Sequence, residues 1–345
     1  MNDNTILLMD IGGTHCRAKI VQGINSKFEE SSVIVSRTVK ISDKHAFLLF
    51  IEQLLGTGSD AGAPDYAVLC FAGPVIGESV SMVNWSGQPK ITLSELIHAG
   101  LPETGITLLN DMEAAAYGLI ACTKGLVKLD ATSLYTGSGS EAPRNANAVL
   151  MIPGTGIGVS AIVGAAETVP DREWEVIGCE LQHTPIPILD EKQDAVFNNM
   201  KTRLSIKRPS WEDFISGRGL ENIYACLIPE GNGQASPGAE QIAHRAISDK
   251  DRACMAALDM FYQCCGALAQ VLSLSFQPYG GLYLAGESTR KNMACIPDSP
   301  FLSQLHDNEV RAELLKQFPV YLVRNELNLD GAAYVAGRYI NSNPI

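Results

Sequence analysis

The sequence has 345 residues, which at roughly 100–200 residues per domain indicates two domains. Charged residues make up 19% and apolar residues 46%, a balance found in folded globular proteins and not in disordered chains. The net charge is −12, from 26 basic and 38 acidic residues. A nucleic acid is therefore not the expected partner, because phosphate backbones are bound by basic surfaces.

The N-terminus, MNDNTILLMD, lacks the basic region and the long apolar stretch of a secretory signal. Nine scattered cysteines without a C-x-x-C pair are expected to be reduced thiols, and both features predict a cytoplasmic protein. Two uncharged stretches, residues 148–166 and 260–286, are long enough to suggest membrane spans. Pro and Gly interrupt each of them, which favours buried elements of a folded domain over a membrane partner.

In the first half, apolar runs predict strands at residues 5–11, 16–22, 33–40 and 66–71, with a helix at 44–55 that Asp43 would cap. A strand at 107–109 leads into Asn110, Asp111 and the helix-forming run MEAAAYGLIAC. Residues 123–147 are rich in Gly and Ser and are expected to be an exposed loop. Their G-x-G-x-x-A run at 137–142 lacks a preceding apolar strand, which favours a flexible loop over a dinucleotide site.

In the second half, six apolar residues recur at alternating steps of four and three: Cys254, Leu258, Phe261, Cys265, Leu268 and Leu272. This spacing indicates the buried face of a long helix rather than a cofactor site. A strand at 282–285 and a helix at 331–340 follow. Alternating strands and helices are typical of the α/β class, in which active sites favour strand ends that meet a helix, as at Asn110 and Asp111.

The chain contains a candidate internal repeat. At an offset of 142 residues, residues 7–21 align with 149–163 and share five identities in fifteen positions. Both segments consist of an apolar run, a Gly/Thr turn and a second apolar run, which predicts two hairpins in two similar halves. Chance similarity between buried hairpins is the alternative.

The turns of both hairpins carry residues suited to binding phosphate. In the first, Asp10 ends a strand, Gly12 and Gly13 would adopt positive φ so that the backbone approaches a ligand, and the next residue supplies a hydroxyl. In the second, Gly154 and Thr155 would offer backbone N–H groups and a hydroxyl to a second phosphate position. Each turn alone fits an ordinary hairpin, but the pair favours phosphoryl transfer.

Six segments resemble those of the bacterial-type glucokinases of the hexokinase/actin-like ATPase superfamily, in the order that this family uses. They are LLMDIGGTHCR, LLNDMEAAAYG, MIPGTGIGVSAIV, Glu180-Leu181-Gln182-His183, WEDFISGRGLENIY and GGLYLAG. The resemblance covers the full length and implies an internally duplicated α/β fold of two actin-like (ribonuclease H-like) domains with a central cleft. The small domain would comprise residues 1–110 plus 329–345, and the large domain residues 111–328.

The resemblance also implies ATP-dependent phosphorylation of D-glucose at its 6-hydroxyl, with ATP and Mg²⁺ as cofactors and a homodimer as the assembly. Asp111 would be the general base. Such a transfer needs one carboxylate within hydrogen-bond reach of the hydroxyl, besides positioning and neutralisation of charge. The alternative is that Asp111 caps the helix that follows it.

The resemblance also assigns roles to the remaining site residues, including those of the two predicted phosphate turns. The sugar would be bound by Asn84, Asn110, Glu180, His183 and Glu212. The phosphates and the nucleotide would be bound by Asp10, Gly12, Gly13, Thr14, Gly154, Thr155, Gly217, Gly219 and Gly286. Asp10 would also organise Mg²⁺ through water. Without the resemblance, His183 fits a structural histidine and Glu212 a solvated acid on a helix.

Three positions, in two segments, depart from the family pattern. Leu181 and Gln182 replace the usual Gly-Gly between Glu180 and His183, which leaves the preferred hexose open. Glu287 stands where the family has a second glycine, which places an acid near the expected nucleotide. A kinase for mannose, fructose or an N-acetyl amino sugar, and a non-catalytic sugar-sensing protein, are the alternatives.

Overall fold

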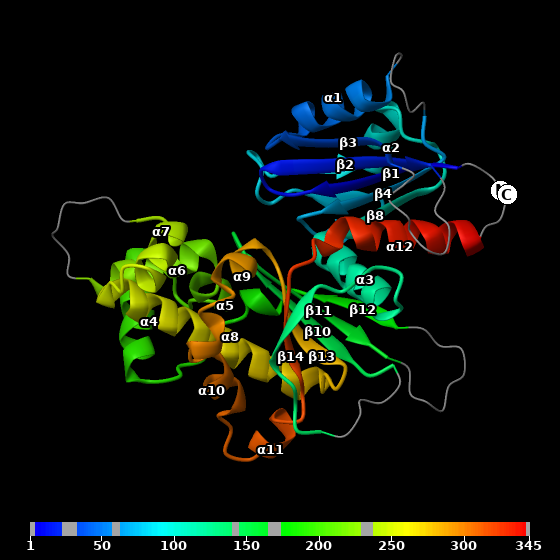
Figure 1. The fold of residues 1–345 in the computed structure, drawn as a ribbon. Helices are drawn as coiled ribbons and strands as arrows, with labels where there is room; N and C mark the ends of the chain where they lie inside the picture. The colour runs from blue at the N-terminus through cyan, green and yellow to red at the C-terminus, as the bar shows by residue number, and fades with distance from the viewer. Residues whose placement is uncertain are drawn as a thin grey trace. The chain divides into compact units, whose positions relative to one another are not determined.

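The computed structural model describes residues 4–22, 33–56, 63–139, 145–164, 174–228 and 237–342, and the chain forms two compact units (Figure 1). Unit 1 comprises Met1–Leu129 and Glu326–Ile345, and unit 2 comprises Asp130–Asn325. Helix α3 (Asp111–Thr123) belongs to unit 1, where it packs against the C-terminal helix α12 (Leu327–Ser342). The sequence-based boundary at residues 110/111 thus falls within this unit.

Unit 1 contains a five-stranded sheet in the order β3-β2-β1-β4-β8. β2 is antiparallel to β1 and β3, whereas β4 is parallel to β1 and β8. The bounds are β1 (Thr5–Ile11), β2 (His15–Gln22), β3 (Val33–Lys40), β4 (Tyr66–Phe71) and β8 (Ile106–Asn110). All five strands predicted for this half are confirmed.

Alternation along β1 sends its side chains to two faces of the sheet. The odd-numbered residues pack with α1 (Lys44–Leu55) and α2 (Leu93–His98), and the even-numbered residues face α3 and α12 (Figure 1). Asp10 continues the even-numbered row and so lies on the face that α3 and α12 cover. Asp43 caps α1 as predicted, with its carboxylate accepting the Ala46 N–H at 2.9 Å.

A small antiparallel sheet, β5-β6-β7, completes unit 1. Its strands are β5 (Val75–Ile76), β6 (Ser79–Ser81) and β7 (Lys90–Thr92). The loop between β6 and β7 carries Asn84 and Trp85, and the Trp85 indole is buried against Phe47, with 5.7 Å between the ring centroids. This anchor holds the loop that contains Asn84 to the main core of the unit.

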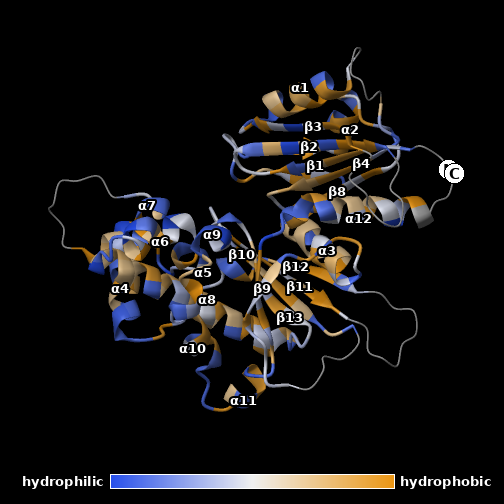
Figure 2. Ribbon diagram, in the orientation of Figure 1, coloured by the Kyte–Doolittle hydropathy of each residue, from blue (hydrophilic) through white to orange (hydrophobic). Residues whose placement is uncertain are grey.

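Unit 2 contains a six-stranded sheet in the order β12-β11-β10-β13-β14-β9, whose strands are mainly hydrophobic (Figure 2). From β12 to β14, the order and the strand directions repeat those from β3 to β8 in unit 1. The predicted duplication is therefore confirmed, with the hairpin β10–β11 as the counterpart of β1–β2. The bounds are β9 (Ala131–Tyr135), β10 (Ala148–Pro153), β11 (Ile157–Val163), β12 (Glu175–Cys179), β13 (Gly281–Leu284) and β14 (Val320–Val323).

Helix α8 (Arg252–Phe276) is the core helix of unit 2. It packs against several neighbouring helices, and all six residues of its predicted apolar stripe are buried. It is also long and apolar enough to cross a membrane, but 67% of its most apolar window is buried inside the unit, as in the core helix of a globular domain. The other helical elements are η2 (Leu181–His183), α4 (Glu191–Arg203), α5 (Trp211–Phe214), α6 (Gly217–Leu227), α7 (Ala239–Ile247), α9 (Glu287–Asn292), η3 (Ile296–Asp298), α10 (Phe301–His306) and α11 (Ala312–Leu315).

The expectation of an exposed loop over residues 123–147 is wrong in part. Residues 131–135 form β9, which pairs in the antiparallel direction with β14 at the edge of the sheet. Because an edge strand exposes much of its surface, the apolar pattern that marks a strand is weak here. Residues 140–142, the end of the G-x-G-x-x-A run, lie outside the described residues.

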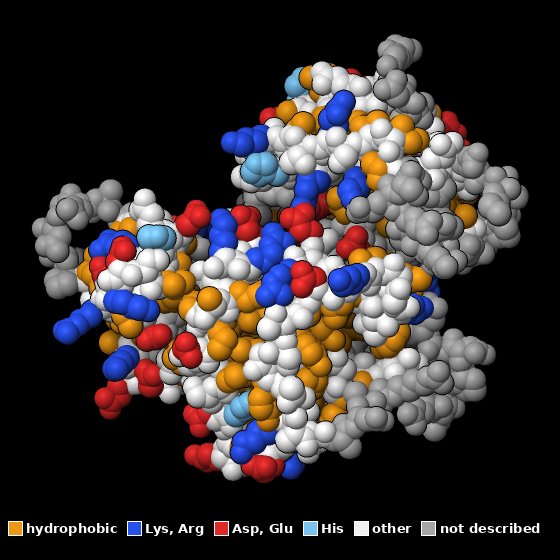
Figure 3. Space-filling model, in the orientation of Figure 1, with side chains coloured by type: hydrophobic (Ala, Val, Ile, Leu, Met, Phe, Trp, Pro, Cys, Tyr) orange, Lys and Arg blue, Asp and Glu red, His pale blue; other side chains and the backbone are white. Residues whose placement is uncertain are grey.

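Charged side chains of both signs are interspersed on the face of the molecule that Figure 3 shows. Ion pairs within each unit join neighbouring elements, as Arg324 and Asp130 do at 3.2 Å in unit 2. Exposed pairs of this kind contribute about 0–1 kcal/mol each. The stability of each unit therefore rests on its buried apolar core.

Candidate active site

The carboxyl ends of three parallel strands meet at one edge of the sheet in unit 1. Asp10 of β1 is paired with Cys70 of β4, and the next residue of β4, Phe71, is paired with Asn110 at the end of β8. Asp111 follows as the first residue of α3. Burial raises the pKa of the Cys70 thiol well above its ordinary value, and the charges of Asp10 and Asp111 raise it further. Both carboxylates therefore lie near one thiol, and the predicted strand-to-helix junction is confirmed.

Asp10 is buried and makes three hydrogen bonds to side chains. Arg17 donates from Nε and Nη2 to Asp10 Oδ2 at 2.9 and 2.5 Å, and Asn328 Nδ2 donates to Oδ1 at 2.9 Å. Arg17 also pairs with Glu326. Burial opposes the charge of Arg17, but the two carboxylates outweigh burial and raise its pKa. The chain's own side chains thus fix the Asp10 carboxylate in position.

Asn110, and not Asp111, is the N-cap of α3. Its Oδ1 accepts the Met112 N–H at 2.9 Å, its Nδ2 donates to the Gly73 carbonyl at 3.1 Å, and Glu113 completes a capping box. Asp111 occupies the first helical position, where its Oδ1 also accepts the Met112 N–H at 2.9 Å. Asn110 is thus the N-cap residue, and the side chain of Asp111 shares in capping the first turn of the helix. The helix N-terminus stabilises the negative charge of Asp111.

The β1–β2 turn is closed by a hydrogen bond from the Gly12 N–H to the His15 carbonyl at 2.9 Å. The expectation of positive φ at Gly12 and Gly13 is wrong, since neither has it. A Cβ at Gly13 would instead lie 3.2 Å from the Asn84 Cβ, so close packing is what favours glycine there. Asn84 thus lies against the first predicted phosphate turn, whose Thr14 hydroxyl is exposed and contacts His15 Nδ1 at 3.0 Å.

In unit 2, the β10–β11 turn is tied to the N-terminus of α6. The Gly217 N–H donates to the Gly154 carbonyl at 2.8 Å, beside Thr155. Glu212 lies on the other side of the turn: its Oε2 accepts the Ile157 N–H at 3.4 Å, and a Cβ at Gly156 would be only 2.7 Å from that oxygen. Glu212 does lie on a helix, but its side chain is turned toward the second predicted phosphate turn.

The turn η2 brings Glu180 and His183 together at the surface. His183 Nε2 lies 3.3 Å from Glu180 Oε2, and the two side chains are 56% and 63% exposed. The same Oε2 accepts a hydrogen bond from Gln182 Nε2 at 2.7 Å. η2 packs against α5, the helix of Glu212, and the Trp211 N–H donates to the Thr184 carbonyl at 3.2 Å. These contacts place three predicted sugar ligands on two adjoining elements, and the exposure of His183 does not suit a buried structural role.

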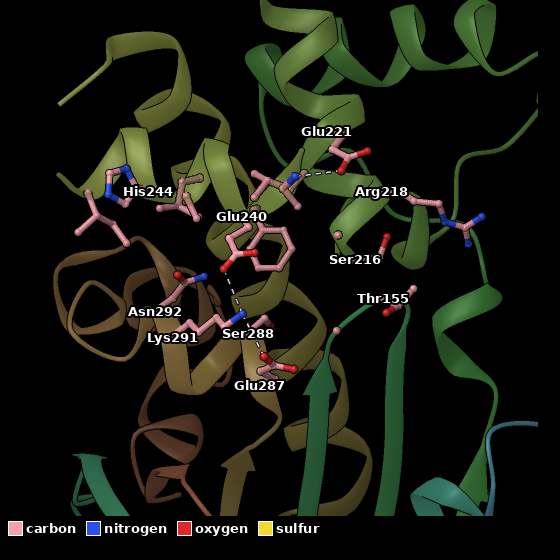
Figure 4. A pocket seen from close by; sticks show the side chains of 18 of the residues that line it. Thr155, Ser216, Arg218, Glu221, Glu240, His244, Glu287, Ser288, Lys291 and Asn292 are labelled. Carbon is pink, nitrogen blue, oxygen red and sulfur yellow. Dashed lines mark hydrogen bonds and ion pairs between the residues drawn. The ribbon is translucent and has the colours of Figure 1, made fainter. Parts of the chain in front are cut away.

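A pocket of about 800 Å³ opens in unit 2 beside the β10–β11 turn (Figure 4). Its volume is in the range typical of small-molecule sites, about 300–1,000 Å³. Gly154, Thr155 and Gly217 line it on one side, and residues of α7 and α9 on the other. Gly286, at the start of α9, has φ +92, which favours glycine, and a Cβ there would lie 2.7 Å from Ile152 Cγ2.

Glu287, the predicted acid near the nucleotide, lines this pocket together with Lys291. Lys291 Nζ lies 3.0 Å from Glu287 Oε1 and 3.1 Å from Glu240 Oε1, so it links α9 to α7 (Figure 4). The hydrogen bonds to Glu287 and Glu240 raise the pKa of Lys291. Lys291 thus places a positive charge beside Glu287, the acid that departs from the family pattern.

Three residues with direct contacts to the predicted site were not singled out from the sequence: Arg17, Lys291 and Asn328. Arg17 could have been found, because the predicted hairpin pairs Asp10 with Arg17. Asn328 could not, because no local pattern relates it to Asp10.

The described residues contain no group of three or more His, Cys, Asp or Glu side chains that could hold a metal ion. Mg²⁺ in phosphoryl-transfer sites needs no such cage, because it keeps several waters and binds through phosphates and one or two carboxylates. Three donated hydrogen bonds already occupy the Asp10 oxygens, which offer about four lone-pair positions in total. Asp10 therefore suits contact with a hydrated Mg²⁺ through water and not direct coordination.

The family model described as Glucokinase matches residues 7–339. A glucokinase from Mesorhizobium japonicum is 28% identical over 324 residues, 93% of this chain and 88% of the relative. The crystal structure of glucokinase from Balamuthia mandrillaris in complex with glucose has a TM-score of 0.84 at 20% identity, over 97% of this chain and 94% of that chain. A ROK family glucokinase from Streptomyces griseus, in complex with glucose and AMPPNP, has a TM-score of 0.62 at 19% identity, over 97% and 99%. These structures confirm the predicted actin-like α/β fold.

Proposed function

The chain belongs to the glucokinase family, and we propose that it transfers the γ-phosphoryl group of ATP to the 6-hydroxyl of D-glucose. The bond from sugar O6 to the γ-phosphorus forms, the bond from that phosphorus to the β,γ-bridging oxygen breaks, and ADP leaves. The observation that carries the proposal is the position of Asp111 at the N-terminus of α3, on the same sheet edge as Asp10.

Asp111 is the proposed general base and receives the proton of the 6-hydroxyl as O6 attacks. Its neighbour Asn110 supports this role, because the capping box fixes the strand-to-helix junction from which Asp111 projects. A carboxylate held on a rigid element meets the need for positioning in a transfer with a loose transition state.

The proposed sugar ligands are Glu180, His183 and Glu212 in unit 2, and Asn84 and Asn110 in unit 1. Carboxylates accept hydrogen bonds from hydroxyl groups, whereas amide and imidazole groups can donate or accept. The packing of η2 against α5 supports the assignment of the first three to one sugar.

The proposed phosphate ligands are the two hairpin turns, with Gly12, Gly13 and Thr14 in unit 1 and Gly154 and Thr155 in unit 2. The proposed nucleotide site is the pocket beside the second turn, which Gly217 lines. Gly219 lies in the first turn of α6, and Gly286 precedes α9; both helices contribute residues to the pocket lining. Mg²⁺ bound to the phosphates would neutralise their charge during the transfer. Asp10 would hold the hydrated ion through water, in the orientation that Arg17 and Asn328 impose on its carboxylate.

A coupled assay of ADP release with Mg·ATP tests the proposal against glucose, mannose, fructose, glucosamine and N-acetylglucosamine. We expect the highest kcat/KM with glucose. In Asp111→Asn, kcat should fall about 10²–10⁴-fold while glucose still binds, because the amide keeps the shape of the side chain but cannot take the proton.

Turnover near that of the wild type in Asp111→Asn would contradict the assignment of the base. Activity with another hexose only would keep the reaction type and change the substrate, a result that the neighbourhood of Gln182 would explain. Binding of a hexose without turnover of ATP would favour a sugar-sensing protein.

A further inference from the structure

Gln182 is a buried polar residue inside an exposed polar turn. The residue is 7% exposed, although the side chains of Glu180 and His183 both reach solvent. It lies in η2, which packs against β11 and α5. Its amide Nε2 donates to Glu180 Oε2 at 2.7 Å, a short contact for a hydrogen bond between a neutral donor and a charged acceptor.

The orientation of the Gln182 amide follows from chemistry. An ionised carboxylate can only accept hydrogen bonds, so the NH₂ group must face Glu180. The amide oxygen, Oε1, is then buried and has no hydrogen-bond partner among the residues that the structure describes. A buried unpaired oxygen destabilises a protein, and an apolar side chain of similar size would avoid it. The cost of the unpaired oxygen offsets what the hydrogen bond to Glu180 contributes, so stability alone does not explain a glutamine at this position.

The contacts that Gln182 and His183 make with the Glu180 carboxylate both involve the same oxygen. Gln182 Nε2 and His183 Nε2 approach Oε2, at 2.7 and 3.3 Å. They fix the rotation of the carboxylate and turn Oε1 away from both side chains. Oε1 is then the oxygen placed to accept a hydrogen bond from a ligand hydroxyl.

We propose that Gln182 is a positioning residue for the sugar site, whose amide holds Glu180 so that Glu180 Oε1 accepts from a hexose hydroxyl. The inference rests on the proposed function. Orienting the carboxylate in advance removes part of the entropy cost of binding, so Gln182 acts on sugar affinity and not on the transfer of the phosphoryl group.

The test is Gln182→Met, which keeps the length of the side chain and removes the amide. We expect the Kd for glucose, measured by calorimetry without nucleotide, to rise about tenfold. The kcat at saturating glucose should stay within about twofold, and Tm should stay the same or rise because the unpaired oxygen is gone. In a Glu180→Ala background the same substitution should leave the Kd unchanged, because the group that Gln182 positions is absent.

Gln270→Met is the matched control. Gln270 Nε2 donates to the carbonyl oxygens of Gln304, Leu305 and Asp307 at 3.1, 3.2 and 2.7 Å, away from η2. Removing this amide should lower Tm and leave the Kd for glucose unchanged. The two variants together separate a positioning amide from a structural one.

The inference is overturned if Gln182→Met binds glucose like the wild type, or if it lowers Tm as Gln270→Met does without a change in Kd. It is also overturned if the effects of Gln182→Met and Glu180→Ala on the free energy of glucose binding are additive in the double variant. Failure of the proposed function would show in the wild type, as absence of ADP release with every hexose tested, before a variant is compared.

Discussion

Arg17 lies directly opposite Asp10 in the first hairpin and donates from two nitrogens to the same carboxylate oxygen, at 2.9 and 2.5 Å. The side chain of Asp10 is 9% exposed, whereas that of Arg17 is 33% exposed. The Asp10 carboxylate is thus shielded from most solvent, whereas the Arg17 guanidinium keeps more of its contact with solvent. A buried carboxylate without its partner carries a large desolvation cost, so Asp10 depends on Arg17 more than Arg17 depends on Asp10.

Arg17→Met should therefore lower the free energy of unfolding by about 2–4 kcal/mol, less than for a fully buried pair because solvent reaches Arg17. Urea unfolding at neutral pH measures the change. The double variant Arg17→Met, Asp10→Asn should recover part of the loss, since a neutral amide needs no counter-charge. Equal stability of Arg17→Met and the wild type would show that the pair does not support the fold.

Gly156→Ala should disturb the sugar site through Glu212. The new Cβ would lie 2.7 Å from Glu212 Oε2, and the end of a flexible side chain yields more easily than the backbone. We expect the KM for glucose to rise about tenfold or more, with a small change in Tm. In the control Gly238→Ala, the Cβ would lie 3.7 Å from Glu221 Oε1, an ordinary contact, so KM should not change. An unchanged KM in Gly156→Ala would remove Glu212 from the sugar site.

The features predicted from the sequence are those that local patterns encode. The hairpin β1–β2 follows from two apolar runs around a Gly/Thr turn, and α8 from an apolar stripe at helical spacing. The junction at Asn110 and Asp111 needed no long-range information, because a strand pattern ends where a helix pattern begins. That the two hairpin turns and this junction act together was expected from the family resemblance and not from any local pattern.

The features that the sequence did not predict depend on contacts between distant segments. Asn328 reaches Asp10 only because α12 returns to the sheet of unit 1. The residue that approaches Gly13 closely is Asn84, from a distant loop, and Gly13 has no positive φ. The residue type alone does not show which of these two reasons favours glycine. The amide of Gln182 could equally have pointed to solvent, and only the packing of η2 buries it.

Cys16 should make the fold sensitive to alkaline pH. Burial, and then the charge of Asp10, raise the pKa of its thiol from 9.0 to about 12. The folded state therefore keeps a proton that the unfolded state loses, so this contribution to stability is complete below pH 9 and is lost between about pH 9 and 12. The free energy of unfolding should fall as pH rises above 9, by up to about 1.4 kcal/mol per pH unit for this group. Urea unfolding of Cys16→Ala should show a smaller slope than that of the wild type, and equal slopes would contradict the assignment.

Lys291→Met should weaken ATP binding if the pocket of unit 2 is the nucleotide site. Lys291 lies between Glu240 and Glu287, and its loss would leave two carboxylates beside a ligand that is itself an anion (Figure 4). We expect the KM for ATP to rise about 3–10-fold at low ionic strength and less in high salt, because these groups are exposed and screened. Lys291→Met, Glu287→Gln should restore part of the affinity, since it removes one of the two negative charges. If neither variant changes the KM for ATP, the nucleotide binds elsewhere, and the acid at position 287 is then irrelevant to the choice of phosphoryl donor.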